Sequence, residues 1–333
     1  MARPLLEVRG LVKHYPVRKS LRGGPKGLVK AVDGVDLHVL EGETLGLVGE
    51  SGCGKSTLAR QIFRLEKPTA GQIFFQGRNI LSLKRAELKK LRQEMQLIFQ
   101  DPFSSLNPRL TVGQIVEEPL DIHRIGEKSW RREEMERILG EVGLSPEHAE
   151  RFPHEFSGGQ RQRIGIARAL ILKPKLIVAD EPISALDVSI QAQVLNLLRE
   201  LQNSYGLTYI FIAHDLSVVR YISDRIAVMY LGRIVEISDR DHFSHPPIHP
   251  YTEALLSANP VPDPKAKPER IILAGDVPSP TNPPGGCRFH TRCPLAVDPI
   301  CSRIEPAMVR LRNNRLMACH RRAPAEGVDV EPA

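Results

Sequence analysis

Apolar residues follow two kinds of pattern along the chain up to about residue 240. Short continuous apolar runs are expected to form buried strands, because strands covered on both faces lack polar alternation. These runs are Thr44–Val48, Met95–Phe99, Leu176–Ala179 and Leu207–Ala213. Between them, apolar residues recur at helical spacing, for example from Ile164 to Ile171 and from Ile190 to Leu201. The alternation predicts an α/β domain around a largely parallel sheet.

Two changes of pattern divide the chain. Residues from about 101 to 165 contain helical patterns and few strand-like runs, which predicts a helical subdomain inserted into the sheet domain. After Phe243, prolines recur every few residues and exclude long regular elements. We therefore expect a sheet domain over residues 1–243 and a separate C-terminal extension over residues 244–333.

Residues 49–57 read GESGCGKST and match the phosphate-loop pattern GxxxxGK[ST], between an apolar run and a helical pattern. Glycines let backbone N–H groups turn toward a β-phosphate, and the helix directs its positive end there. Lys55 would bridge the β- and γ-phosphates, and Ser56 would ligate Mg²⁺. This context predicts a phosphate-loop NTPase core that binds ATP. The candidate nucleotide-binding residues of the loop are Gly49, Ser51, Gly52, Cys53, Gly54, Lys55, Ser56 and Thr57.

Polar residues follow the other predicted strands. The strand that begins at Leu176 ends in Asp180, which suits Mg²⁺ coordination, and Glu181, which is placed to act as a general base on water. Gln100 and His214 each come directly after another strand. Ligands of open α/β sheets bind at the carboxyl ends of the strands, so we expect these side chains to meet the phosphate loop there.

A helical pattern begins at Ser157-Gly158-Gly159-Gln160. Ser157 can cap the helix, and the two glycines permit close approach of another backbone, so the helix start is a second candidate anion site. Taken alone, these four residues fit an ordinary capped helix better.

Together these motifs resemble those of ABC-transporter ATPases. The phosphate loop, Gln100, FSGGQRQR from Phe156, the Asp180-Glu181 pair, SALD ending at Asp187, and His214 occur in that family's order and spacing, over roughly residues 5 to 240. Each position holds the residue that working sites of the family use. The resemblance therefore implies a catalytically competent ATPase.

The resemblance also implies how the residues act. Two ATPase domains would pair head to tail around two ATP molecules, with the phosphate loop from one chain and Ser157–Gln160 from the other. Tyr15 would stack on adenine, His214 would contact the γ-phosphate, and Asp187 would link the two sites. Gln100 would sense Mg²⁺ and water and connect to the transmembrane partner.

The C-terminal extension narrows the resemblance. HPPIHPYTEALL from His245, and QDPFSSLNPR from Gln100, resemble segments of ATPase subunits from oligopeptide, dipeptide and nickel uptake systems. The chain is most similar to the second of their two different ATPase subunits. This implies a heterodimer with a homologous ATPase, two transmembrane permeases and an extracytoplasmic solute-binding protein. We expect import of di- or oligopeptides, with nickel or glutathione as the alternatives.

Four of the five cysteines lie close together in the extension, at Cys287, Cys293, Cys301 and Cys319. Clustered cysteines in a cytoplasmic chain favour a metal over disulfides. No CxxC pair is present, and a proline follows Cys293, so a [4Fe–4S] cluster fits at least as well as zinc. The resemblance favours the cluster, which would tie the extension together, and Zn²⁺ or no metal at all stay open as the alternatives.

Composition changes this picture little. Lysine and arginine (46) exceed aspartate and glutamate (39), which suits polyphosphate ligands, nucleic acid or an anionic membrane surface. The chain has no apolar stretch long enough to span a bilayer, and its start lacks the apolar core of a signal peptide. We expect a peripheral protein on the cytoplasmic face of the inner or plasma membrane, held there by permeases.

Other classes of function fit less well. An ABC-type ATPase acting on DNA or the ribosome would carry a long coiled-coil insertion or a second ATPase unit, so no nucleic-acid partner is expected. A module that holds ATP without hydrolysing it would not need Glu181 and His214. An exporter would usually be fused to membrane helices. The transported solute itself cannot be deduced from this chain.

Overall fold

The computed structural model describes residues 3–17, 27–101, 105–246, 248–258, 270–311, 314–323 and 331–332. The chain forms two compact units, each built from separate stretches of sequence. The first unit comprises Met1–Leu5, Val39–Thr44 and Asn79–Ile212. The second unit comprises Leu6–His38, Leu45–Arg78 and Ala213–Ala333.

The first unit contains three parallel strands, with β7 (Leu176–Asp180) between β6 (Met95–Ile98) and β8 (Thr208–Ile212). Every residue of β8 is buried, and only the last residue of β7 is partly exposed. The prediction of buried parallel strands from continuous apolar runs is therefore confirmed for β7 and β8, whereas the two middle residues of β6 are only partly buried. Phe99 lies beyond the end of β6 and is 45% exposed.

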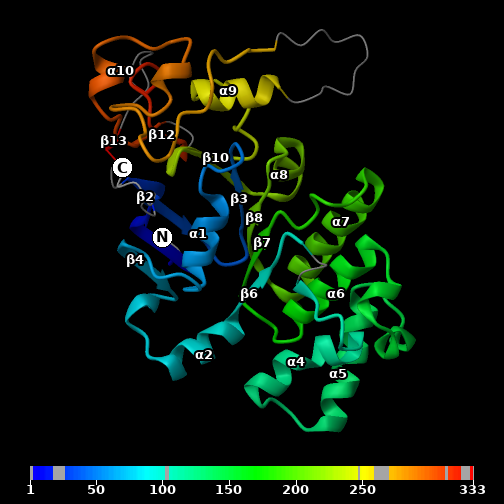
Figure 1. Cartoon of the computed structure of the whole chain (residues 1–333). Coiled ribbons are helices and arrows are strands. Elements are labelled where there is room, and N and C mark those ends of the chain that lie inside the picture. The colour runs from blue at the N-terminus through cyan, green and yellow to red at the C-terminus, as the bar shows by residue number, and fades with distance from the viewer. Residues whose placement is uncertain are drawn as a thin grey trace, which may run out of the picture. The chain divides into compact units, whose positions relative to one another are not determined.

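Helices form the rest of the first unit. The two segments with helical spacing are α6 (Gly158–Leu170) and α7 (Val188–Tyr205), as predicted. Within the predicted helical subdomain lie α4 (Val112–His123), α5 (Lys128–Glu141) and the short 3₁₀ helices η2 (Pro146–Glu150) and η3 (Pro153–Glu155), with α4 packed against α5 (Figure 1). The described residues between β6 and α6 include no strand. Two further elements, η1 (Ile80–Ser82) and α2 (Arg85–Glu94), precede β6.

The second unit has a sheet that begins with β3 and continues into the C-terminal extension. Its strand order is β13-β11-β12-β10-β9-β3, where β3 and β9 are parallel and the remaining neighbours are antiparallel. The bounds are β3 (Thr44–Val48), β9 (Arg225–Tyr230), β10 (Arg233–Asp239), β11 (Val309–Arg310), β12 (Leu316–Met317) and β13 (Glu331–Pro332). The strands after residue 243 belong to the same sheet as β3, β9 and β10. The predicted domain boundary at residue 243 therefore stays a prediction.

A second sheet of this unit has the strand order β2-β1-β4-β5, with β1 antiparallel to β4. Its strands are β1 (Leu6–Pro16), β2 (Leu28–Val39), β4 (Ala70–Phe75) and β5 (Arg78–Asn79), which ends one residue into the first unit. The pattern of continuous apolar runs did not predict these strands, because partly or fully exposed residues separate the buried residues of β1 and β2.

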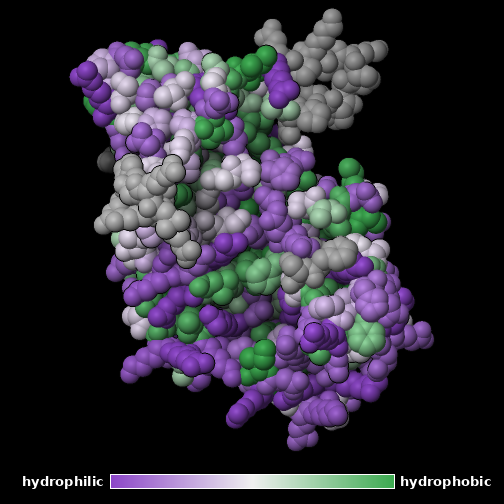
Figure 2. All heavy atoms as spheres, viewed as in Figure 1, coloured by the Kyte–Doolittle hydropathy of each residue, from purple (hydrophilic) through white to green (hydrophobic). Residues whose placement is uncertain are grey.

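The helices of the second unit are short. They are α1 (Lys55–Ile62), α8 (Leu216–Ile222), α9 (Pro250–Ser257), α10 (Ile300–Arg303) and the 3₁₀ helix η4 (His290–Arg292). After residue 243 the described elements have eight residues or fewer, as the frequent prolines predict. In the described residues, no helix has the length and apolar character needed to cross a membrane. The face shown in Figure 2 carries mainly hydrophilic side chains, with apolar side chains in separate patches.

Candidate nucleotide-binding site

The phosphate loop of the second unit connects β3, which ends at Val48, to α1, which begins at Lys55. Gly49 and Gly54 have φ angles of 155° and 113°. A Cβ atom on Gly49 would collide with the carbonyl oxygen of Met229, and one on Gly54 with that of Ala31. These two positions therefore need glycine both for their backbone conformation and for lack of space.

Lys55 lies folded against its own loop. Its side chain is buried, and Nζ donates to the carbonyl oxygens of Gly49 at 2.7 Å and Glu50 at 3.2 Å. Cys53 is buried beside it, and desolvation raises the pKa of the Cys53 thiol, which agrees with a packing role for this residue. The amine is thus fixed within the loop whose N–H groups would face a phosphate.

Two other predicted residues belong to the second unit. Tyr15 is on β1, where its hydroxyl donates to Glu66 and the ammonium group of Lys13 lies 5.0 Å from its ring centroid. His214 follows β8 and is exposed. The next residue, Asp215, caps α8 by accepting from the backbone N–H of Ser217 at 2.7 Å.

In the first unit, the predicted catalytic carboxylate and the predicted glutamine lie together. Gln100 Nε2 donates to Glu181 Oε2 at 2.8 Å, just past the ends of β6 and β7. The backbone N–H of Glu181 donates to the carbonyl oxygen of Ile212 at 2.9 Å, and Glu181 has a φ of 47°, which is rare for a residue with a side chain. Asp180 is the last residue of β7. The strand-end grouping predicted for Gln100 and Glu181 is thus observed.

The helix start at Ser157 is self-contained. The Ser157 hydroxyl accepts from the N–H of Gln160 at 3.4 Å, and the Gln160 side chain accepts from the N–H of Ser157 at 3.0 Å. This reciprocal capping box leaves Ser157 exposed on the surface. Asp187 precedes α7 and is also exposed, next to Val188, which is 81% exposed.

The chain matches two family models. Residues 32–184 match the model "ABC transporter", and residues 235–301 match "Oligopeptide/dipeptide transporter, C-terminal region". "Probable peptide ABC transporter ATP-binding protein y4tS" of Sinorhizobium fredii is 54% identical over 333 residues, which is 100% of this chain and 94% of the relative. "Oligopeptide transport ATP-binding protein AppF" of Bacillus subtilis is 55% identical over 95% of this chain and 97% of the relative.

The chain belongs to the ATP-binding proteins of ABC transporters. The fold agrees, because the ATP-binding cassette MJ0796, in a dimeric post-hydrolysis state bound to ADP and Pi, matches with a TM-score of 0.63 and 31% identity over 71% of this chain and 98% of that chain. The predicted family and the predicted phosphate-loop ATPase fold are confirmed.

The prediction of a metal-bound cysteine cluster in this ABC ATPase is wrong. Within the described ranges, no group of three or more His, Cys, Asp or Glu side chains is placed to hold a metal ion. Cys319 packs instead with Leu311 and Met317 in a small apolar cluster, and burial raises the pKa of Cys287 to about 11. Neither a [4Fe–4S] cluster nor zinc is supported.

The contacts that the extension of this ABC ATPase makes with the phosphate loop were not predicted from the sequence. Tyr251 on α9 and Arg292 on η4 both bond to Glu50, the second residue of the loop. A cavity of about 210 Å³ lies beside Glu50. It is lined by residues 50–53 of the loop, by Tyr230 and Leu231, and by residues 277–280. Contacts across 201 and 242 residues of chain leave no local signal.

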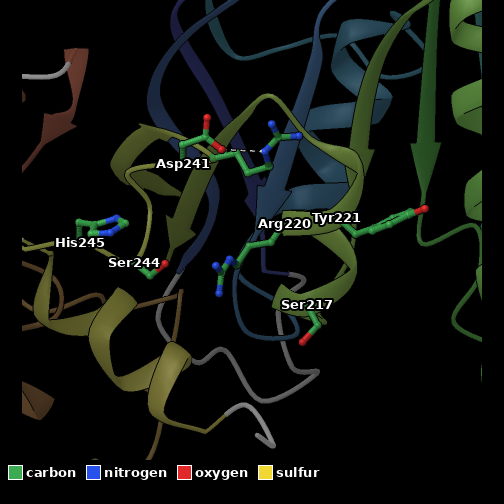
Figure 3. Close-up of a pocket in the computed structure, with 7 residues that line it drawn as sticks. Ser217, Arg220, Tyr221, Asp241, Ser244 and His245 are labelled. Atoms are coloured by element: carbon green, nitrogen blue, oxygen red, sulfur yellow. Dashed lines mark hydrogen bonds and ion pairs between the residues drawn. The ribbon is translucent and has the colours of Figure 1, made fainter. Parts of the chain in front are cut away.

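A hollow of about 500 Å³ in the second unit lies apart from the phosphate loop. No residue of the phosphate loop lines it. Its side chains come from α8 and from the segment after β10, and they include an ion pair between Arg240 and Asp241 (Figure 3).

Proposed function

We propose that this ABC ATPase hydrolyses ATP to energise the import of di- or oligopeptides. The observation that carries the proposal is the sequence similarity of the whole chain to its relatives. It includes the region matched by the oligopeptide/dipeptide transporter model, and the relatives are named as peptide transport proteins. Glutathione or nickel would be alternative solutes of the same machinery.

The nucleotide would bind at the phosphate loop. Backbone N–H groups and Lys55 would hold the phosphates, because the glycine conformations turn the loop and the amine already lies within it. Tyr15 would stack on the adenine. Ser56 and Asp180 supply oxygen donors, the type that Mg²⁺ prefers, and the ion would neutralise phosphate charge.

Hydrolysis would begin with proton removal from water by Glu181. The hydrogen bond from Gln100 supports this role, because it fixes the orientation of the carboxylate through an amide that can also contact water. His214 would contact the γ-phosphate. The left-handed backbone of Glu181 is a strained conformation of the kind often found at functional sites.

We infer that two ATPase subunits close around the nucleotide. Ser157–Gln160 of one chain would face the phosphate loop of the other, and Asp187 would lie at the junction. The support is that Ser157 and Asp187 are exposed and that the similar cassette MJ0796 is described as dimeric with ADP and Pi. The partner would be a second, homologous ATPase, which makes the pair a heterodimer.

The other proposed partners are the proteins that an importer needs to move its solute across the membrane. Two transmembrane permeases would hold the ATPase pair at the cytoplasmic face of the inner or plasma membrane, and an extracytoplasmic binding protein would deliver the solute. No role in binding nucleic acid is proposed.

The test is solute-stimulated ATPase activity of the complete transporter in lipid vesicles. The binding protein would be supplied with di- and oligopeptides, glutathione or Ni²⁺ in separate assays, with Glu181→Gln complexes as the background. We expect peptides to stimulate hydrolysis. Stimulation by Ni²⁺ or glutathione alone would replace the peptide assignment, and no hydrolysis under any condition would refute the ATPase role.

A further inference from the structure

Glu50 joins the phosphate loop to the C-terminal extension through an ion pair. Arg292 Nη1 donates to Glu50 Oε2 at 2.8 Å, and Arg292 Nη2 donates to Glu50 Oε1 at 3.1 Å. The Arg292 side chain is only 9% exposed, so the pair is shielded from water on one side. Two parallel bonds between a guanidinium and a carboxylate fix orientation as well as distance.

A second bond reaches the backbone of the same residue. The N–H of Glu50 donates to the Tyr251 hydroxyl at 2.9 Å, and Tyr251 is fully buried. Desolvation, together with the charge of Glu50, raises the pKa of Tyr251, so its hydroxyl stays neutral and can accept this bond. Both the side chain and the main chain of Glu50 are therefore held by the extension.

The groups that hold Glu50 are themselves fixed by packing. The Tyr251 ring lies 4.7 Å from the Tyr230 ring and 5.3 Å from the Phe289 ring, measured between centroids. Tyr230 ends β9, which pairs with β3, the strand that leads into the loop. Aromatic side chains in contact restrict one another's rotamers, so the Tyr251 hydroxyl has little freedom to leave Glu50.

Glu50 is the second residue of the phosphate loop. It lies between Gly49, whose backbone is confined by Met229, and residues 51–54, whose N–H groups would bind phosphate. If Glu50 lost its bonds to Tyr251 and Arg292, the loop would sample more conformations. Nucleotide binding would then have to order the loop, and the entropy cost of this ordering would weaken the affinity. A site held in its bound conformation binds more tightly because this ordering is already done.

We propose that Tyr251 and Arg292 are positioning residues of the nucleotide site, through which the C-terminal extension holds the phosphate loop in its anion-binding conformation. The proposal rests on the proposed binding of ATP by that loop. It gives the extension a role in nucleotide affinity within this chain. Linkage requires the reverse effect as well, so bound nucleotide should stabilise η4 and α9.

The test uses the full-length chain and its affinity for fluorescent ADP with Mg²⁺. Tyr251→Phe removes the hydroxyl and keeps the ring, and Arg292→Ala removes the ion pair. We expect Tyr251→Phe to weaken binding by about tenfold, the effect of one lost buried hydrogen bond, and Arg292→Ala, which loses two bonds to Glu50, to weaken it at least as much. Arg292→Lys, which keeps the charge but not the paired geometry, should fall between wild type and Arg292→Ala.

Two controls match these changes. Tyr209→Phe removes a buried hydroxyl that has no hydrogen-bond partner in the described part of the chain. Arg137→Ala breaks a two-bond ion pair with Glu134 on α5, which belongs to the first unit. Both should bind nucleotide as wild type does. In a double-mutant cycle, Glu50→Gln combined with Arg292→Ala should weaken binding no more than Arg292→Ala alone.

The outcomes separate the two proposals. If wild type binds and Tyr251→Phe and Arg292→Lys bind equally well, the positioning role is overturned and the ATPase role stands. The same holds if these variants lower only the melting temperature of the nucleotide-free protein. If wild type itself does not bind nucleotide, the proposed function fails.

Hydrogen exchange gives a further readout, because nucleotide should slow amide exchange in residues 287–293, and unchanged exchange would contradict the coupling. Should Arg292→Ala not fold, Tyr251→Phe and Arg292→Lys carry the test.

Discussion

Two helix starts of this ABC ATPase are candidates for contacting phosphate, and they are held in opposite ways. The start of α1 follows a glycine-rich loop whose shape depends on Met229, Ala31 and the extension. The start of α6 is held by its own residues, because Ser157 and Gln160 cap each other and stay at the surface. The start of α1 is therefore organised by other parts of its unit, whereas the start of α6 is capped by its own residues and leaves Ser157 exposed to another molecule.

The largest effect expected from a substitution separates binding at α1 from chemistry. Glu181→Gln removes the proposed base, so hydrolysis by the assembled ATPase pair should fall about 10²- to 10⁴-fold while ATP binding remains. Single-turnover hydrolysis and nucleotide retention measure the two quantities. Substantial residual turnover would remove Glu181 from its proposed role.

The phosphate loop before α1 should tolerate an added methyl group less well than the start of α6 does. Gly54→Ala should weaken nucleotide binding by about a hundredfold, because the new Cβ collides with the Ala31 carbonyl and the backbone has φ of 113°. Gly158→Ala is the matched control at α6, since its Cβ would meet only Leu186, at 3.4 Å. Titration of fluorescent ADP into the single chain measures both. Equal losses would mean that the two helix starts do not differ in this way.

Lowering the pH should reduce the stability of the fold around α9, the helix that carries Tyr251. Burial lowers the pKa of His249 from 6.5 to about 3, and its Nδ1 accepts from the N–H of Tyr251 at 3.1 Å. The unfolded chain therefore binds a proton below pH 6.5 that the folded chain refuses until about pH 3, so stability is lost as the pH falls through that window. The contribution of His249 at pH 5 should be a loss of about 2 kcal/mol. Glu236, which accepts from the N–H of His249, acts in the opposite direction because burial raises its pKa to about 7, so the His249 contribution is measured by comparison with a variant.

Urea unfolding at pH 7.5 and pH 5 checks this expectation. His249→Asn can still cap α9 but does not titrate, so its free energy of unfolding should fall less between the two values. A drop as large as that of wild type would show that other groups cause the acid sensitivity.

The smallest effect concerns α6. Ser157→Ala removes the cap and should lower the free energy of unfolding by about 1 kcal/mol. Nucleotide binding by the single chain should stay unchanged, while hydrolysis by the assembled pair should fall. Chemical denaturation and the two activity assays together decide it. Weaker binding by the single chain would place Ser157 in the chain's own site.

Prediction from the sequence succeeded where the signal is local. Continuous apolar runs located β3, β6, β7 and β8 to within two residues at each end, because burial on both faces is written in consecutive residues. Strand-end position also predicted that Gln100 and Glu181 meet. The strands β1 and β2 were missed because their partly exposed residues do not form continuous apolar runs.

In the C-terminal extension, prediction from the sequence was less successful. Close spacing of four cysteines along the chain indicated a metal, yet a metal site depends on how side chains converge in space, and the described residues form no such group. Prolines correctly predicted short elements, but they carry no information about which sheet those elements join.

The sequence alone determined the phosphate loop, the strand-end carboxylates, the helix start at Ser157 and the family, because each depends on residues within a few positions of one another. Only the tertiary structure decided that Tyr251 and Arg292 hold Glu50 and that the strands after residue 243 continue the sheet begun by β3. The physical reason is that these contacts join residues 201 and 242 positions apart, and the packing that brings them together involves the whole unit rather than any one segment.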